Sequence, residues 1–567
     1  MKKSLLFLSA SIAFSALAAD HEPELWFGEA MSGISPDGNW IAGQIADGSV
    51  SIRNLETDQQ WLYFSDGGNR NYYVGHGLPV SNTGVIAGAT TTSNAAYWEN
   101  GQWTVLPTPN PGTVSNAVSI TPDGGIICGG VGQAPMGGDT ETTMMHPALW
   151  YRQENGKYSD PVVLPHPDLD LTGRAPQYIT AIAISDDGKT VAGQLMDYFG
   201  GCCEPLIYQC DENGEWSYTL LGRDLLNPTN IEFPEWPGGL DDEILMPTQE
   251  WYMTPEQIEA FVEAFNAWDN TGEPPHYEDF MTPEAIEEYQ KDMKEYLEIY
   301  LPWQEKFNTF MDVYRQYLAR AASFGFNNGR LSPDGKYYVT TAGGVRPQGS
   351  SRNGAFPVIF DTESGEYTIL NSNRTVSVNY VAADYTILAN MGGGGGDVGT
   401  IKSYVFPQMQ PGGMFLEDWI QEINPDLYDW MEQKLYQDVI VGIDANNVYQ
   451  TELMFCTGIP TATPDMKYIL TNNYTSSWLD DPGQDFVSVL LPTGLGASTG
   501  GDDEENGKDA VNEILADDSF ETYHVYDLTG RLLLTTDNAA ELNNLKGIYI
   551  VKAANKEGKA KTYKIVL

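Results

Sequence analysis

Short apolar runs separated by glycine-containing turns recur along the middle of the chain. Each of five segments has an apolar run, a tight turn built on Asp, Asn or Thr and Gly, and a second apolar run: 31–43, 77–88, 117–129, 181–193 and 328–340. Four further segments give a strand, a polar glycine turn and a strand: 95–107, 147–165, 205–221 and 357–370. Turns of this composition favour β-hairpins. Each repeat therefore predicts four antiparallel strands.

The spacing of these repeats predicts a mainly β fold, a β-propeller of about seven blades over residues 19–493. Four strands joined by short turns, repeated every 40 to 60 residues or so, are typical of a propeller blade. Weaker repeats begin near Val378 and Thr461, which brings the total to seven. The last repeat lacks a fourth strand. We expect residues 24–27 to supply it and close the ring, because closure removes two exposed strand edges.

The connections between predicted strands differ in length in a regular way. Those between strands 1 and 2, and between strands 3 and 4, are always short. The other connections contain every long segment: 130–146, 194–204, 222–322, 341–353 and the glycine run 392–396. One face of the propeller is therefore elaborated, and we expect a ligand site there.

A helical insertion is predicted at about 223–322. Residues 254–257 (Thr-Pro-Glu-Gln) have the pattern of a helix N-terminus, and apolar residues follow at helical spacing as far as Trp268. A second helix is expected to start at Thr282 and to be interrupted at Pro302. We interpret the aromatic residues of both helices as helix-packing core. A shorter helix is expected near 416–435.

The two ends of the chain differ from the middle. Two lysines, an apolar run and Ala-Leu-Ala make residues 1–18 a predicted secretory signal peptide. Residues 494–516 form an acidic, glycine-rich linker. Residues 517–567 alternate in polarity, with seven acidic and seven basic side chains, and predict a small C-terminal β-sandwich.

Three motifs in this C-terminal segment carry a resemblance. VYDLTGRLL (525–533), LKGIYIVK (545–552) and a terminal KIV resemble the type A sorting domain of the type IX secretion system of Bacteroidetes-type bacteria. The resemblance implies that residues 517–567 engage the type IX secretion machinery, and that the protein is then released or attached at the cell surface. The SPDG turns resemble TolB-like propeller repeats, and the HPALW and ENG pattern is similar to extracellular HAF-type repeats. These last two resemblances imply a fold and no activity.

Charge and motif content exclude several classes of function. The chain has 78 acidic and 30 basic side chains, a net charge of −48, and no basic stripe, which argues against nucleic-acid binding. It contains no HExxH motif, Walker loop or Rossmann fingerprint, so no cofactor is predicted. No metal is predicted either, because Cys128, Cys202, Cys203 and Cys210 lack zinc-site spacing and the acidic loops lack EF-hand spacing. These cysteines could form a disulfide or remain buried thiols.

A few cations stand on the long connections of this acidic chain, and we predict that they bind the ligand. They are His146, Arg174, Arg346, Arg352 and Arg374. A single histidine such as His146 can equally be a structural hydrogen-bonding group, and no catalytic residue is assigned.

The leading hypothesis is an exported, secreted or cell-surface propeller that binds an extracellular polymer or protein partner. The alternatives are an extracellular glycan- or peptide-degrading enzyme with its site on the elaborated face, and an adhesive protein that docks through the helical insertion.

Overall fold

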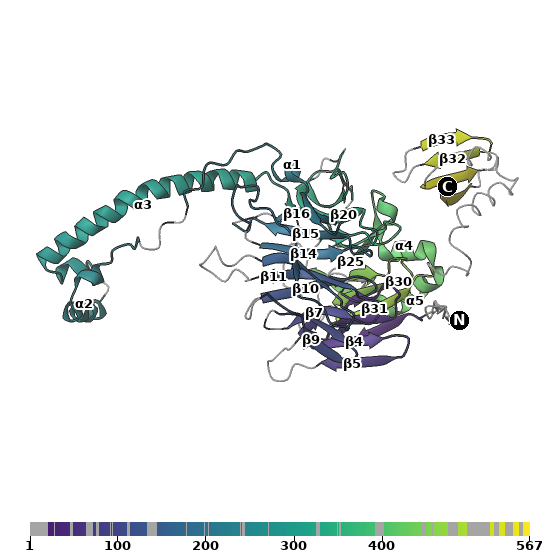
Figure 1. The fold of residues 1–567 in the computed structure, drawn as a ribbon, viewed down its shortest axis with the longest axis horizontal. Helices are drawn as coiled ribbons and strands as arrows, with labels where there is room; N and C mark the ends of the chain where they lie inside the picture. Colours follow the sequence, from purple (N-terminus) through teal and green to yellow (C-terminus); the bar gives the residue numbers. More distant parts are fainter. Residues whose placement is uncertain are drawn as a thin grey trace, which may run out of the picture. The chain divides into compact units, whose positions relative to one another are not determined.

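A computed structural model describes most of the chain between residues 21 and 566 (Figure 1). The residues outside the description in this interval are 28, 46–48, 64–71, 75–78, 91, 93, 110–113, 133–144, 177, 198, 202, 239, 241–243, 270, 325–328, 349, 351–352, 373, 392–401, 444–448, 456–457, 475–485, 496–521, 527–531, 539–547 and 555–559. The predicted signal peptide, most of the predicted linker, Arg352 and Cys202 therefore lie outside the described residues.

The described strands form the seven blades of a β-propeller, which confirms the predicted fold class (Figure 1). Within a blade, neighbouring strands pair antiparallel and follow one another along the chain. Blade 1 consists of β2 (Glu29–Ile34), β3 (Trp40–Ile45), β4 (Val50–Asn54) and β5 (Gln59–Tyr63). Blade 2 consists of β6 (Tyr72–Val74), β7 (Ile86–Thr90), β8 (Ala95–Glu99) and β9 (Gln102–Val105). Blade 3 consists of β10 (Val114–Ile120), β11 (Ile126–Gly132), β12 (Met145–Tyr151) and β13 (Val162–Val163).

The remaining blades follow the same plan. Blade 4 consists of β14 (Tyr178–Ile184), β15 (Thr190–Met196), β16 (Cys203–Cys210) and β17 (Trp216–Leu220). Blade 5 consists of β18 (Ser323–Phe324), β19 (Arg330–Leu331), β20 (Tyr337–Val345), β21 (Gly354–Asp361) and β22 (Tyr367–Ile369). Blade 6 consists of β23 (Val376–Val381), β24 (Ile387–Met391), β25 (Lys402–Phe406) and β26 (Met414–Phe415), and blade 7 contains β29 (Ile459–Ala462), β30 (Tyr468–Tyr474) and β31 (Phe486–Pro492).

The ring closes through the N-terminus, as the sequence predicts. Strand β1 (Glu24–Phe27) pairs antiparallel with β31 and becomes the fourth strand of blade 7. Trp26 lies opposite Ser488 in this pairing and is 8% exposed, whereas its neighbour Phe27 is 74% exposed. The first and last parts of the propeller thus share one sheet, in which β31 is paired on both sides, by β30 and by β1.

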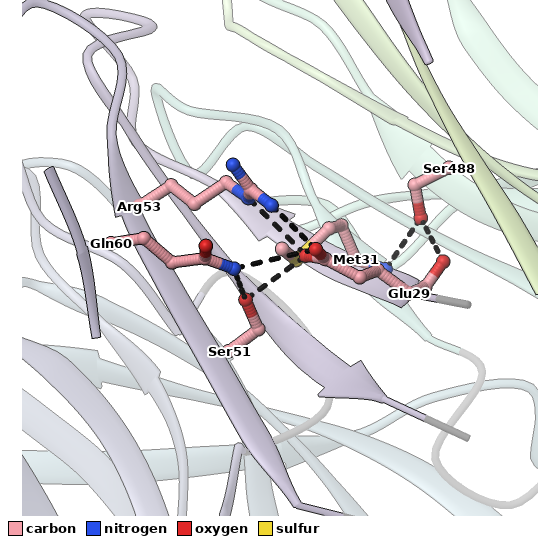
Figure 2. A network of polar contacts seen from close by, with 6 residues as sticks. All are labelled: Glu29, Met31, Ser51, Arg53, Gln60 and Ser488. Atoms are coloured by element: carbon pink, nitrogen blue, oxygen red, sulfur yellow. Dashed lines mark hydrogen bonds and ion pairs between the residues drawn. The ribbon is translucent and has the colours of Figure 1, made fainter. Parts of the chain in front are cut away.

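A polar network strengthens this closure (Figure 2). The Ser488 hydroxyl accepts the Met31 N–H at 2.7 Å and donates to the Glu29 carbonyl at 2.7 Å, which joins blade 7 to blade 1. The Glu29 carboxylate in turn accepts hydrogen bonds from Arg53, Ser51 and Gln60 within blade 1. A largely buried carboxylate paired in this way has its hydrogen-bonding needs met.

The turn between the first two strands follows one design in nearly every blade. In blade 1 the Ser35 hydroxyl donates to Asp37 and accepts the Trp40 N–H, so the Ser and Asp side chains fix the turn. The same pair of contacts occurs at Thr121, Ser185, Ser332 and Thr463. Local hydrogen bonds of this kind are why Ser, Thr and Asp are favoured in turns.

Neighbouring turns are also joined to one another. The backbone N–H groups of Asn82, Asp186 and Ala383 donate to the carbonyls of Pro122, Pro333 and Pro464, each at 2.8 Å. Asn82, Asp186 and Ala383 stand where the other turns of the repeat have a proline. A proline could not donate this hydrogen bond, because it has no backbone N–H. The alternation of proline and non-proline turns therefore pairs blades 2 and 3, 4 and 5, and 6 and 7.

The helical insertion is a separate compact unit made of residues 171–174 and 227–321. It contains η1 (Gln249–Tyr252), α2 (Pro255–Ala267), η2 (Tyr277–Asp279) and α3 (Pro283–Leu318) and follows α1 (Arg223–Leu226). Thr254 and Gln257 form the predicted capping box of α2. No described helix is both long and apolar enough to cross a membrane.

One expectation about this insertion is wrong, and another, a helix-packing core of aromatic residues, is confirmed only for the C-terminal part of α3. Pro302 does not interrupt α3, which runs through it for 36 residues. Proline removes one hydrogen bond, but ring contacts from Tyr300 to Trp303 and from Trp303 to Phe307 span the site. The aromatic residues also do not form a common core. No residue of α2 is buried, and α3 buries only Phe310, Tyr314 and Tyr317.

The long connection after blade 6 contains two helices where one was expected. They are α4 (Leu416–Ile423) and α5 (Pro425–Leu435), followed by the hairpin β27 (Tyr436–Ile443) and β28 (Tyr449–Phe455). Asn424 separates the helices, and its side chain accepts the Leu427 N–H. Apolar residues of both helices, such as Ile420 and Met431, pack with the buried core of blades 6 and 7.

The C-terminal strands form an antiparallel sheet of their own, in the order β33-β32-β34-β35. Their bounds are β32 (Thr522–Tyr526), β33 (Leu532–Thr536), β34 (Ile548–Ala554) and β35 (Ala560–Val566). The motif LKGIYIVK thus supplies a central strand. Within the described part of this segment we see one sheet and not the second layer of a sandwich.

Candidate functional site

The predicted cations are spread over different connections of the chain. His146 is half-buried on β12, where it lies opposite Val131. Its ring centroid is 4.9 Å from that of His166, and its Nδ1 has no hydrogen-bond partner among the described residues. Burial, and then the neighbouring His166, lower the pKa of His146. At neutral pH His146 is therefore uncharged and is a poor cation for a ligand.

The four arginines are not gathered into one site either. Arg174 belongs to the compact unit of the helical insertion, where its guanidinium lies 4.5 Å from the ring centroid of Trp236. Arg374 is exposed, and its backbone N–H donates to the Ser372 hydroxyl. Arg352 lies outside the described residues. Arg346 alone of these predicted residues is among the described residues that line a large cavity.

This cavity is a groove between blades 5 and 6 with a volume of about 750 Å³. Blade 5 contributes residues of β20 to β22 and the segment after β20, and blade 6 contributes the turns that follow β23 and β25. Aromatic rings, aliphatic side chains, amides and one guanidinium line it: Tyr337, Arg346, Gln348, Ile359, Tyr367, Leu370, Asn371, Asp384, Tyr385, Gln408 and Met409. Apolar walls with a few polar groups are typical of binding sites.

Tyr385 forms one wall of the groove at a backbone position that is normally glycine. Glycine occupies the equivalent position in the turns of blades 1 to 5, with φ between 71° and 78°. Tyr385 has φ 66°, a left-handed conformation that costs a residue with a side chain of the order of 1 kcal/mol or more. Its ring lies 4.9 Å from that of Tyr337, and its hydroxyl donates to Asp334 at 2.7 Å. The strained backbone thus places a ring that glycine could not supply.

Two more strained residues line the same groove. Gln408 and Met409 have φ 49° and 58°, in the turn that follows β25. Of the seven non-glycine residues with positive φ in the described chain, three therefore belong to this one groove. Backbone strain of this kind tends to collect at functional sites, where the surrounding fold compensates for it.

Two tyrosine hydroxyls of the groove, those of Tyr367 and Tyr385, donate hydrogen bonds to carboxylates. Burial, and then the hydrogen bond to Asp224, raise the pKa of Tyr367 to about 12. Burial, and then the hydrogen bond to Asp334, raise the pKa of Tyr385 well above its usual value. Neither phenol can act as a base near neutral pH, because a general base needs a pKa near the working pH.

The lining of the groove offers surfaces and polar groups that an extended ligand could contact. Tyrosine rings offer faces for the C–H groups of a sugar or the side chains of a peptide, and the amides offer donors and acceptors. Asp384 is the one carboxylate among the described lining residues. The described lining residues therefore do not include the two facing carboxylates that most glycoside hydrolases use.

Most of this groove was missed in the sequence, although one signal was present. The blade 6 turn reads Ala-Ala-Asp-Tyr and the blade 7 turn Thr-Pro-Asp-Met, where the other five repeats have glycine at the fourth position. A tyrosine in a glycine position of a repeat is a departure that needs a reason. Gln408 and Met409 stand outside the repeated turns and gave no comparable signal.

Metal and thiol chemistry find little support in the described residues. No group of three or more His, Cys, Asp or Glu side chains that could hold a metal ion occurs among them. No disulfide joins Cys128, Cys203 and Cys210 to one another. Burial raises the pKa of Cys128 to about 12, so this thiol stays protonated and unreactive.

Comparison with known proteins identifies no family for this chain. No protein-family model matches the chain, and no curated protein does. A manganese complex of an oligogalacturonate lyase matches 82% of this chain and 91% of its own at 12% identity, with a TM-score of 0.41. An oligogalacturonate lyase from Vibrio parahaemolyticus matches 83% and 92% at 11% identity, with a TM-score of 0.37. The β-propeller domain of Cps50 (Swd1) from Myceliophteria thermophila matches 82% and 98% at 9% identity, with a TM-score of 0.38.

Proposed function

We propose that this chain is an exported β-propeller that binds an extracellular polymer, a glycan or an extended peptide, in the groove between blades 5 and 6. The observation that carries the proposal is the clustering of three strained residues, Tyr385, Gln408 and Met409, around one large cavity. Turns without positive φ at these residues would cost less conformational free energy. The strain is therefore explained if these side chains contact a ligand.

The composition of the groove favours binding over catalysis. Tyr337, Tyr367 and Tyr385 supply ring surface, and Arg346 supplies a cation whose Nε already donates to Asn353 at 2.9 Å. That hydrogen bond holds the guanidinium in place, which lowers the entropy lost when a ligand binds. Both raised phenol pKa values make the hydroxyls donors and not proton acceptors.

A thermal-unfolding screen of the mature chain tests this function. A ligand at a hundred times its dissociation constant adds about 2.7 kcal/mol to the unfolding free energy, which is readily measured as a shift. The chain is screened against polysaccharides and extended peptides, and each hit is analysed for products. A shift without products supports binding. A shift with products would make the protein a degrading enzyme, and no shift in any sample would contradict the proposal.

Two groove variants and one control locate the site. We expect Tyr385→Gly to weaken binding at least tenfold, because it removes the ring and its wall while relieving the strained backbone. Arg346→Gln should weaken binding of a polar ligand by a similar factor. Asn100→Gly makes the same backbone change at φ 50° in a hairpin of blade 2, and it should leave binding unchanged. Equal binding by Tyr385→Gly and the wild type would place the site elsewhere.

Export is the second part of the proposal. The signal peptide and the motifs of residues 517–567 support passage across both membranes through the type IX secretion machinery. In a bacterium with this machinery, deletion of 517–567 should leave the protein in the periplasm. Normal appearance of the truncated protein at the cell surface or in the medium would contradict the export proposal. It would not affect the proposal that the groove binds a polymer.

A further inference from the structure

Helix α2 of the insertion has an apolar face that the described chain leaves largely uncovered. Its apolar residues Ile258, Phe261, Val262, Phe265 and Trp268 recur at the spacing of one helix face. None of its residues is buried. Helices of this kind normally fold because their apolar face packs against something.

Only part of this face has a partner within the insertion. The Phe261 ring stacks on Tyr277 at 3.9 Å and meets the edge of Phe280 at 5.8 Å. Phe265 has ring contacts with Phe261 and Trp268 of its own segment, and Val262 and Phe265 remain 46% and 49% exposed. The contact with η2 thus orders the helix and leaves two large apolar side chains available.

Helix α3 shows what a covered face looks like in the same unit. Its apolar residues follow steps of three and four from Tyr289 to Tyr317. Phe233 and Trp236 pack on Phe310, and the Trp303 Nε1–H donates to the Gly238 carbonyl at 3.0 Å. Phe310 and Tyr317 are fully buried as a result. An extended segment of this chain covers only the C-terminal half of α3, from Trp303 to Tyr317, whereas Val262 and Phe265 of α2 have no such cover among the described residues.

Exposed apolar surface and negative charge are both concentrated in this insertion. Nineteen large apolar side chains of the described chain are exposed, and nine of them lie within residues 227–321, about a sixth of the sequence. The same residues carry 21 acidic and five basic side chains. Glu259 and Glu263 lie three residues before and one residue after Val262 in α2, and both are exposed. The face is therefore apolar at its centre and acidic at its edge.

We propose that the Val262 and Phe265 face of α2 docks a basic amphipathic helix of a partner protein. Apolar side chains of the partner pack on Val262 and Phe265, and its lysines or arginines lie beside Glu259 and Glu263. Recognition of one helix by the apolar face of another is a common mode of binding. A second copy of this chain is disfavoured because two acidic insertions repel each other, and an anionic membrane is disfavoured for the same reason. This docking site does not depend on the groove in the propeller.

Designed peptides test the proposal on the full chain. The probe is an 18-residue helical peptide of Leu and Lys with one apolar face, and its comparisons are a Leu/Glu peptide and a Lys/Ser peptide without an apolar face. We expect the Leu/Lys peptide to bind at least tenfold more tightly than either comparison by titration calorimetry. Equal binding of the Lys/Ser peptide would show that charge alone acts and would overturn the proposal.

Two sets of variants locate the interaction. The double variant Val262→Ser and Phe265→Ser should weaken Leu/Lys binding at least tenfold, and Val105→Ser with Val163→Ser, two similarly exposed valines of the propeller, should not. Reversal of charge by Glu259→Lys and Glu263→Lys should transfer the preference to the Leu/Glu peptide, even if the apolar variant folds poorly. Unchanged binding in both sets, dimerisation through α2 in sedimentation, or binding to anionic phosphatidylserine vesicles would each overturn the proposal.

Discussion

The propeller and the helical insertion are stabilised in different ways. In the propeller, five of the blades repeat the same turn contacts and the cores of neighbouring blades are continuous, so the fold depends on many similar interactions. In the insertion, order depends on a few individual features, such as the cap at Thr254 and the rings on Phe310. This difference indicates where functional residues lie. In the propeller we expect them where a blade departs from the repeat, and in the insertion we expect them on an apolar face that the rest of the chain leaves uncovered.

The largest effect is expected at the closure of the ring. Trp26→Ala removes a buried ring from β1, and we expect it to lower the unfolding free energy by about 3 to 5 kcal/mol. Phe27→Ala, at the exposed next position, should change it by about 0.5 kcal/mol or less. Chemical unfolding followed by tryptophan fluorescence measures both. Equal stability of the two variants would show that β1 does not hold the ring.

The next largest effect concerns the polar part of the same closure. Ser488→Ala leaves the buried Met31 N–H without its acceptor, which should cost about 1 to 3 kcal/mol. Ser364→Ala removes an exposed turn hydroxyl and should be nearly neutral. If both variants unfold at the wild-type denaturant concentration, the network of Figure 2 is not part of what closes the ring.

A smaller and local effect is expected in the insertion. Thr254→Ala removes the cap of α2 and should destabilise this helix by about 1 kcal/mol. Hydrogen exchange should speed up over 255–267, while the main unfolding transition of the propeller stays in place. Thr309→Ala, in the exposed middle of α3, should slow exchange slightly because alanine is the better helix former. A change of the main transition by Thr254→Ala would show that the two regions unfold together.

A pH dependence is also expected within the propeller. Burial, and then Asp187 and Asp334, raise the pKa of Asp186 from 3.8 to about 6. At a pH between these two pKa values, the folded protein keeps a proton on the Asp186 carboxyl that the unfolded protein has lost. The free energy of unfolding therefore falls as the pH rises through this range. Asp186→Asn should raise the melting temperature at pH 7 and remove that part of the pH dependence. Asp160→Asn, an exposed control, should leave the melting profile unchanged.

The sequence allowed the propeller and its closure to be predicted because both depend on repetition. Every turn with Ser or Thr, Asp and Gly predicts the same hairpin, and the missing fourth strand of the last repeat points to residues 24–27. The long α3 was predicted as two helices, because one proline was given more weight than the ring contacts of Trp303, which only the packed structure reveals.

The candidate site was predicted less well, for a physical reason. A groove between two blades joins residues as far apart as Tyr337 and Gln408, and no local spacing records that they meet. Positive charge in an acidic chain pointed to Arg346 but also to Arg174, whose guanidinium stacks on Trp236, and to His146, which burial keeps neutral. The departure from the repeat at Tyr385 was the better signal, because it is tied to a backbone conformation.

Hydrogen exchange of the mature chain, with and without a bound polymer, tests whether the groove between blades 5 and 6 is the binding site. We expect a ligand found in the screen to slow exchange at residues 383–385 and 407–411, the two strained turns of the groove, and we expect Tyr385→Gly to abolish this protection. Protection confined to other blades, or unchanged in Tyr385→Gly, would contradict it.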